Sequence, residues 1–149
     1  EDVSVAISDH YLPIGINSDV AKKPISVAVS IIDKIDVLVG FYGINEKPTS
    51  SKDPFALRRN AIGLLRTIIE NKINIQIKDL INYSIVLYEE QNTKFTNQFI
   101  TKEVLAFLRE RFISLFPLIN LEASKYASGL IPPARSIISF IVSFGDKIG

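Results

Sequence analysis

Four basic side chains gather around one predicted loop-to-helix junction, and their chemistry suits phosphate groups. Lys47 and Lys52 lie in a polar stretch, and Arg58 and Arg59 follow in the first turn of a predicted helix. Guanidinium groups bind phosphate oxygens, and the free N–H groups of a first helical turn also favour anions. The positive end of a helix dipole disfavours a cation by roughly 0.3–1 kcal/mol, so this arginine pair needs an anionic partner.

That partner is either a phosphate-bearing molecule or a carboxylate elsewhere in the chain. Asp33 and Asp36 are three residues apart in an apolar helical pattern, so they share a helix face. Because buried carboxylates need partners, both are candidates for structural ion pairs with Arg58 and Arg59. The two interpretations predict opposite directions for the guanidinium groups: toward solvent beside Lys52, or inward toward the aspartates.

The residues for catalysis and metal binding are scarce. The chain has one histidine and no cysteine, so neither a Ser–His–Asp nor a Cys–His set can form. His10 lies on the apolar face of a predicted helix, where a single histidine is typical of a structural residue, and metal ligation needs several convergent donors. A glycine-rich phosphate loop is absent as well. We therefore expect no catalytic residue and no bound metal or cofactor in this chain.

The composition is that of one globular domain. The 149 residues are 47% hydrophobic and 22% charged, with a net charge of +1. Without a general basic field, any RNA contact has to come from a local patch. The longest uncharged apolar runs, residues 24–32 and 136–144, are shorter than the roughly 20 residues that span a bilayer. We expect a cytoplasmic protein without a membrane segment.

Apolar residues at helical spacing predict the first two helices. Residues 2–11 form a short helix that ends at the Leu-Pro pair of residues 12–13. Pro24 opens the second helix, which Gly40 and Gly43 end. Because this helix begins apolar nearly all round, we expect it to be buried on every side, at the centre of the core.

The third predicted helix carries the arginine pair. Asp53 is its expected N-cap and Pro54 its first residue. Its buried stripe is expected to contain Phe55, Leu57, Ala61, Ile62, Leu65, Ile68 and Ile69, and its outward face Arg59, Gly63, Arg66 and Glu70.

The rest of the chain continues the helical pattern. Residues 73–78 alternate like a strand but lack a partner strand, so we interpret them as an extended linker with inward isoleucines. Helices are predicted over residues 79–91, from a Thr101 cap to Leu115 before Pro117, over residues 121–128 and over residues 134–144. The predicted fold is all-α, one compact domain of six to seven helices over residues 1–149.

Several sequence runs resemble one known family. The run DPFALRR, preceded by KPTSSK and with DKIDVLVGFYGI upstream, is similar to the β subunit of bacterial heterotetrameric glycyl-tRNA synthetase. Residues 8–13, SDHYLP, resemble the family's EHYLP segment, and Arg111-Phe112 resembles a later Arg-Phe pair. The resemblance is best over residues 1–91 and weaker over residues 92–149. Since the family's chain is several times longer and this chain has no methionine, we expect an internal fragment.

The resemblance implies a role in aminoacylation. In this family, ATP-dependent glycylation of tRNA takes place on the α subunit, where ATP and magnesium are expected. The β subunit supports binding of tRNA(Gly) and subunit assembly. The expected partners are therefore the α subunit, tRNA(Gly) and the remaining domains of the β chain. Lys47, Lys52, Arg58 and Arg59 are the candidate tRNA-phosphate contacts.

The family also implies a fold similar to the HD phosphohydrolases, all-helical enzymes that bind metal through a histidine, a His-Asp pair and a later aspartate. Asp33 or Asp36 could take the later position, but this chain lacks the His-Asp pair. The alternatives to the tRNA-supporting role are thus a degenerate or active HD-type metal-dependent phosphohydrolase domain and a purely scaffolding helical module.

Overall fold

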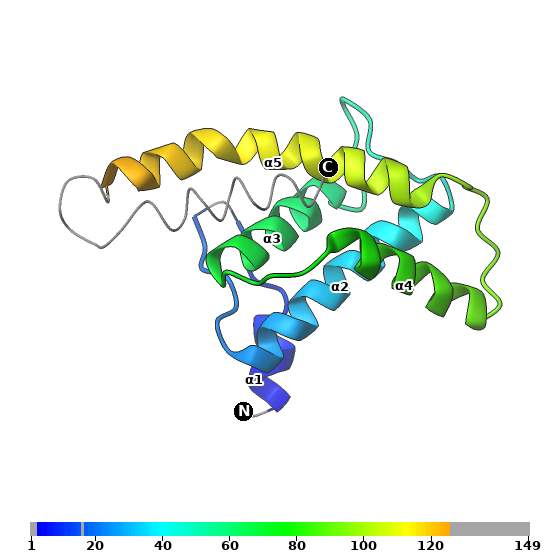
Figure 1. Cartoon of the computed structure of the whole chain (residues 1–149), viewed down its shortest axis with the longest axis horizontal. Coiled ribbons are helices and arrows are strands. Elements are labelled where there is room, and N and C mark those ends of the chain that lie inside the picture. The colour runs from blue at the N-terminus through cyan, green and yellow to red at the C-terminus, as the bar shows by residue number, and fades with distance from the viewer. Residues whose placement is uncertain (1–2, 16, 126–149) are drawn as a thin grey trace.

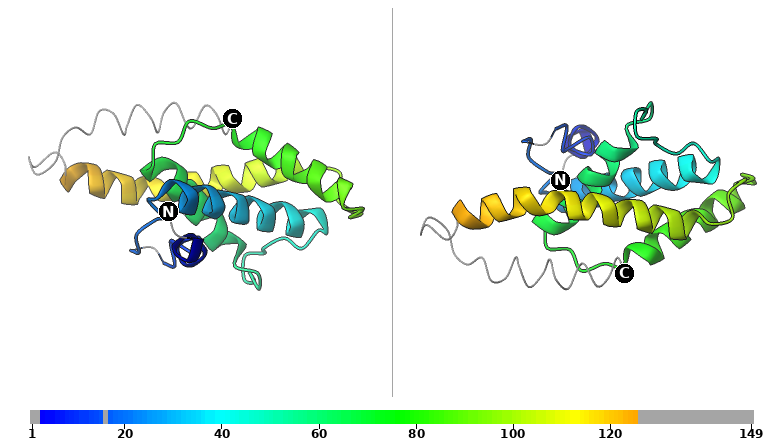
Figure 2. Two further views of the ribbon diagram at one scale, coloured as in Figure 1. Left: turned by 90° about the horizontal axis from the view of Figure 1, so that it is seen from below. Right: turned by 90° about the horizontal axis from the view of Figure 1, so that it is seen from above.

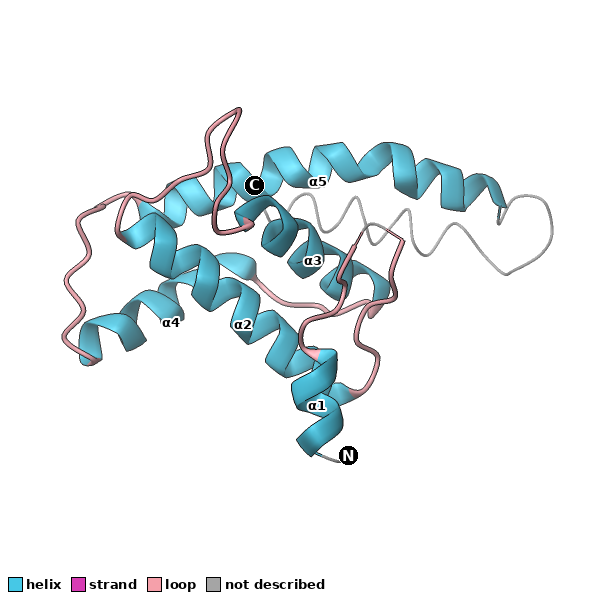
Figure 3. Cartoon of the chain, turned by 180° about the vertical axis from the view of Figure 1, so that it is seen from behind, coloured by secondary structure: helices cyan, strands magenta, loops and turns pink. Residues whose placement is uncertain are grey.

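Five helices make up the part of the chain that the structure describes. The computed structural model describes residues 3–15 and 17–125, in the order α1 (Val3–Asp9), α2 (Pro24–Gly43), α3 (Leu57–Glu70), α4 (Ile77–Glu90) and α5 (Ile100–Lys125). Every element within these residues is helical, and none is a strand (Figure 3). The all-α prediction is confirmed there. The helix predicted over residues 134–144 lies outside the described residues, so the total of six to seven helices stays a prediction.

Helix α2 is the centre of the fold, as predicted. It contacts α1, α3, α4 and α5, while α5 lies across α3 and the second half of α2 (Figures 1 and 2). The core consists of aliphatic and aromatic side chains from these helices, with Leu38, Leu64, Leu65, Ile68, Ile77, Ile81 and Leu108 among those fully buried.

The prediction that α2 is buried on every side is wrong. Ile25, Val29 and Ile32 are 49%, 37% and 64% exposed, respectively. The reason is that α4 reaches this side of α2 only at its second half, where a Cβ on Gly40 would meet the Tyr88 hydroxyl oxygen at 2.7 Å. The helix does begin at Pro24 but passes through Gly40 and ends at Gly43.

Helix α3 begins three residues later than predicted. Its first residue is Leu57, because Ala56 has a left-handed backbone conformation with φ of 53°. Phe55 therefore lies in the preceding turn, 40% exposed, and stacks on Phe41 with ring centroids 4.0 Å apart. Pro54 is likewise outside the helix. A turn between the cap residue and the helix has no signature in apolar spacing, which explains the difference.

The linker prediction for the segment before α4 is confirmed. Residues 73–76 form neither helix nor strand, and Ile73 and Ile75 pack against the core. The last two residues of the alternating run, Ile77 and Lys78, already belong to α4.

Helix α5 differs from its prediction at both ends. It starts at Ile100, and the Thr101 hydroxyl donates to Asn82 Oδ1 at 2.8 Å instead of capping the helix. The side chain of Asn97 accepts from the backbone N–H of Phe99 at 2.8 Å. Pro117 does not end α5, which continues to Lys125 despite the backbone hydrogen bond that a proline removes. The separate helix predicted over residues 121–128 is therefore part of α5 as far as the described residues extend.

No helix in the described ranges combines the length and the apolar character that crossing a bilayer requires.

Candidate nucleic-acid interface

The loop before α3 projects from the helical body at the end opposite to α1 (Figure 1). A tight turn shapes its tip: the backbone N–H of Thr49 donates to the Lys52 carbonyl at 2.8 Å, and the Lys52 N–H donates to Thr49 Oγ1 at 3.1 Å. Lys52 is exposed at this turn. The loop thus presents a lysine to solvent from a hydrogen-bonded support.

Asp53 caps α3 across the intervening turn. Its two carboxylate oxygens accept from the backbone N–H groups of Leu57 at 2.8 Å and Arg58 at 2.9 Å. The N-cap residue is therefore Ala56 and not Asp53, but the Asp53 carboxylate accepts from first-turn N–H groups as predicted. Since the cap already occupies these two donors, they are not free for an external anion.

Arg58 has an internal partner, which is the Asp53 carboxylate that caps α3. Its Nη1 lies 3.8 Å from Asp53 Oδ2, and its Nη2 donates to the Thr49 carbonyl. A carboxylate at the helix start offsets the unfavourable position of this first-turn cation. Arg58 is therefore held against the loop and stabilises it.

Lys47 connects the same loop to α5. Its Nζ lies 2.7 Å from Glu103 Oε2, which also accepts from Asn97 Nδ2 at 2.6 Å. The hydrogen bonds from Lys47 and Asn97 lower the pKa of Glu103 below its usual range. Both ion-pair partners are one-third exposed, so solvent screens the attraction.

Lys52 and Arg59 are the two cations of the predicted set that remain available. Both side chains are exposed, and neither forms an ion pair within the described residues. Arg59 lies in the first turn of α3, at the end where the loop joins the helix. The structure thus divides the predicted set of four into two internally paired and two solvent-facing cations.

Asp33 and Asp36 contact neither arginine in the described part of the chain. Asp33 is half-buried and Asp36 is exposed on α2. Next to Asp36 is Tyr88, whose hydroxyl donates to the Asp36 carbonyl at 3.4 Å. Burial, assisted by the Asp36 charge and a hydrogen bond, raises the pKa of Tyr88 to about 12. The ion-pair role of the two aspartates stays a prediction.

A buried lysine between the two aspartates was not predicted from the sequence. Lys34 is only 3% exposed, and its Nζ donates to the His10 carbonyl and to Ser30 Oγ, each at 2.8 Å. Burial lowers the pKa of Lys34, while the charge of Asp33 acts in the opposite direction. The signal in the sequence was the spacing of Ser26, Ser30 and Lys34, which puts three polar residues on one stripe of α2.

Arg66 was expected on an outward face, and the structure places it under the N-terminal loop. Its Nη1 donates to the Gly15 carbonyl at 3.2 Å and its Nη2 to the Ser18 carbonyl at 2.9 Å. Its Nε donates to Glu70 Oε1 at 2.8 Å. Gly63, expected on the same outward face, is buried. Arg66 therefore holds the Gly15 and Ser18 carbonyls against α3.

His10 has a local structural setting. Its Nδ1 lies 2.5 Å from the Ile7 carbonyl oxygen, one turn back in the chain. The described residues contain no group of three or more His, Cys, Asp and Glu side chains that could hold a metal ion.

Comparison with known proteins identifies the sequence class to which this helical chain belongs. The profile of the family described as glycyl-tRNA synthetase beta subunit matches residues 1–125. The chain is 36% identical over 146 residues to the glycine–tRNA ligase beta subunit of Ruegeria sp., covering 96% of this chain and 21% of that protein. It is 40% identical over 112 residues to that of Enterobacter sp. and 39% to that of Salmonella typhi, covering 75% of this chain and 16% of each relative.

The chain therefore belongs to the glycyl-tRNA synthetase β-subunit family, a family of aminoacyl-tRNA synthetase subunits. The resemblance recognised in the sequence is confirmed. The chain spans about a fifth of the length of the curated relatives it matches.

Proposed function

We propose that this chain works within a glycine–tRNA ligase β subunit, where it supports the binding of tRNA(Gly) through the exposed pair Lys52 and Arg59. The observation that carries the proposal is the division of the cations at the loop before α3. Lys47 and Arg58 neutralise internal acids, whereas Lys52 and Arg59 face solvent at the same end of α3. Contacts of this kind position an RNA backbone without reading its bases.

The proposal assigns two roles to the original set of four cations. Lys52 and Arg59 contact phosphates, and Lys47 and Arg58 hold the loop in the shape that presents them. ATP-dependent glycylation, with its ATP and magnesium, is assigned to the α subunit. The described part of this chain offers no cluster of metal-ligating side chains that suggests a reaction of its own.

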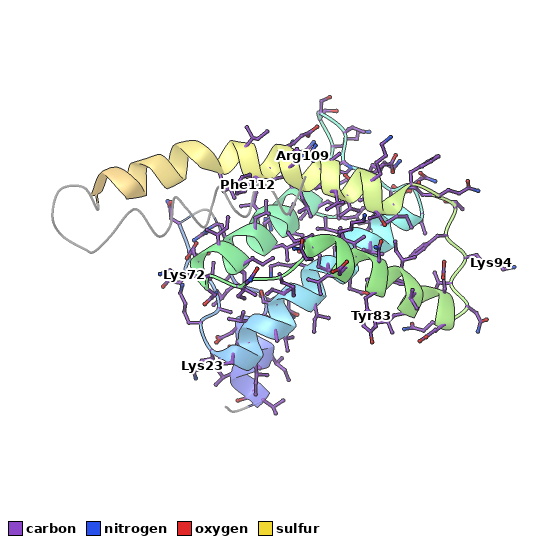
Figure 4. The ribbon with its side chains drawn as sticks, in the orientation of Figure 1. Lys23, Lys72, Tyr83, Lys94, Arg109 and Phe112 are labelled. Atoms are coloured by element: carbon purple, nitrogen blue, oxygen red, sulfur yellow. The ribbon has the colours of Figure 1, made fainter. Side chains whose placement is uncertain are left out.

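The test is the salt dependence of tRNA(Gly) binding by the complete synthetase. Each phosphate contact contributes about 0.7–0.9 to the slope of log K against log salt concentration, so Lys52→Ala and Arg59→Ala should each lower that slope by nearly one unit. The matched control is Lys23→Ala, because Lys23 is exposed at the start of α2, far from the loop (Figure 4). Unchanged slopes in both Lys52→Ala and Arg59→Ala would rule out direct contact of these two residues with tRNA phosphates.

The Arg58→Ala variant distinguishes a residue that shapes the loop from one that contacts tRNA phosphates directly. If Arg58 acts only by shaping the loop, its loss weakens tRNA binding but leaves the salt slope of the residual binding close to that of the wild type. A slope lowered by one unit would instead make Arg58 a phosphate contact.

We further propose that the fold is related to the HD phosphohydrolases in architecture only. The ring of the single histidine lies against the Ile7 carbonyl, and its own carbonyl accepts from Lys34 of α2, which supports a domain without that family's metal chemistry. The test is phosphatase activity of the full subunit with added manganese. Activity lost in His10→Ala would revive the enzymatic alternative.

A scaffolding role, in which this chain packs against other domains of the β subunit, is a second candidate function. It is favoured by the exposed apolar side chains of α2 and α4, which the tRNA proposal does not use.

A further inference from the structure

One side of α2 is covered by α4 over its second half and uncovered over its first half. Ile25, Val29, Ile32 and Asp36 follow each other at intervals of three and four residues, so they lie along one side of the helix. At Asp36 and Gly40 this side meets Tyr88 of α4. Before Asp36, no other described helix covers it, and Ile25, Val29 and Ile32 stay exposed.

Helix α4, which packs beside α2, also carries exposed apolar side chains. Tyr83 and Leu87 are one helical turn apart and are 65% and 38% exposed, respectively. Figure 4 shows Tyr83 on the side of α4 that faces away from α5. We call Ile25, Val29, Ile32, Tyr83 and Leu87 the α2–α4 apolar surface.

The α2 part of this surface lacks the charges of a solvated helix face. Residues 24–32 of α2 include no charged side chain, although the amphipathic helix of a typical domain places charges outward. Asp36 is the charged residue that follows at the α4 end of the row. Five exposed large apolar side chains on two adjacent helices indicate a surface that is buried in the working protein.

We propose that the α2–α4 apolar surface packs against an apolar helix from the remaining part of the β subunit. The relatives are about five times longer than this chain, since it covers 16% to 21% of their length. The geometry suits a helix, because α4 already packs as a helix on the adjoining stretch of the same side of α2. The inference rests on the proposal that the chain works inside such a subunit.

The size of the surface favours a segment of the same chain over a separate molecule. A stable interface between two proteins uses about 20–30 residues from each partner, and this surface offers five large apolar side chains. A covalently tethered segment has a high effective concentration, so a small apolar contact is enough to keep it bound. A second copy of this chain or the α subunit would need a larger area.

The experiment places a photo-crosslinking amino acid at Ile32 in the full-length β subunit, assembled with its α subunit, and identifies the linked peptides by mass spectrometry. The matched control position is Ile113, which is 60% exposed on α5, away from the α2–α4 apolar surface. The expected result is a crosslink within the same β subunit, to residues outside positions 1–149. Its yield should be at least several-fold higher than at Ile113.

Four outcomes would overturn the proposal: crosslinks from Ile32 to the α subunit, to a second β chain, or to residues 126–149, and a yield no higher than at Ile113. A second measurement does not depend on the crosslinker. Ile32→Glu should lower the thermal unfolding midpoint of the full-length subunit, whereas Ile113→Glu should leave it unchanged. Because neither readout involves tRNA, these results are independent of the salt-slope test at Lys52 and Arg59.

Discussion

Lys34 lies directly beneath Gly63, where α2 crosses α3. Its Cε is 2.9 Å from the position that a Cβ on Gly63 would occupy, and Pro13 Cδ is 3.3 Å from the same point. The missing side chain of Gly63 therefore makes room for the lysine stem, whose amine bonds to the segment that follows α1. One lysine thus joins three parts of the fold.

The stability contribution of Lys34 should depend on pH. Burial lowers its pKa in the folded state from 10.5, so between the lowered pKa and 10.5 the unfolded chain binds more protons than the folded chain. Folding stability then rises with pH in this window. We expect the difference in unfolding free energy between the wild type and Lys34→Met to shift in favour of the wild type as the pH rises toward about 10.

Urea denaturation at a series of pH values measures this difference. Lys23→Met is the matched control, because it makes the same substitution at an exposed lysine and leaves the buried amine in place. A wild-type advantage over Lys34→Met that shrinks as the pH rises would contradict the assignment of a buried, desolvated amine.

Gly43→Ala should destabilise the fold, because the added methyl group would overlap the Phe95 ring, which covers the end of α2. Crowding a packed site typically costs about 1–3 kcal/mol. Gly15→Ala is the matched control, since no atom of the described residues outside its chain neighbours lies within 4 Å of the position its Cβ would take. It should stay within about 0.5 kcal/mol of the wild type. Thermal or urea unfolding compares the two variants. Equal stability of both would show that Phe95 moves aside freely.

Asp53→Ala should lower the unfolding free energy by about 1–2 kcal/mol, because it removes the cap of α3 and the partner of Arg58 together. Asp53→Asn keeps an oxygen for the cap but loses the charge, so its unfolding free energy should lie between those of the wild type and Asp53→Ala. Circular dichroism during urea unfolding measures the series. An Asp53→Ala variant as stable as the wild type would mean that solvent replaces the cap at no cost.

Arg66→Lys should loosen the loop that precedes α2. A lysine cannot reproduce the guanidinium fork that reaches the Gly15 and Ser18 carbonyls. A hydrogen bond from a charged donor contributes about 1.5–3 kcal/mol to stability. Limited proteolysis should therefore cleave near residues 14–19 faster in this variant. Arg59→Lys is the matched control, because Arg59 is exposed and its replacement should leave the cleavage rate unchanged.

Local sequence patterns were sufficient for most helix positions. Pro24 marked the start of α2 because its fixed φ suits a first helical turn, and the apolar spacing of residues 57–69 marked the body of α3. The predicted start at Pro54 was wrong because Ala56 adopts a left-handed conformation, which is uncommon for alanine and has no signature in the sequence. The predicted end of α5 before Pro117 was wrong as well. Proline usually ends a helix, yet α5 continues through this residue.

The sequence by itself determined the family, the all-helical class and the place where basic residues gather, because each of these depends on neighbours along the chain. Only the tertiary structure decided which cations are free. Lys47 meets Glu103 from α5, and Arg66 meets the carbonyls of residues 15 and 18. Lys34 of α2 is enclosed between α3 and the segment that follows α1. Such pairings join residues tens of positions apart, and whether a charge is solvated or satisfied internally depends on that packing.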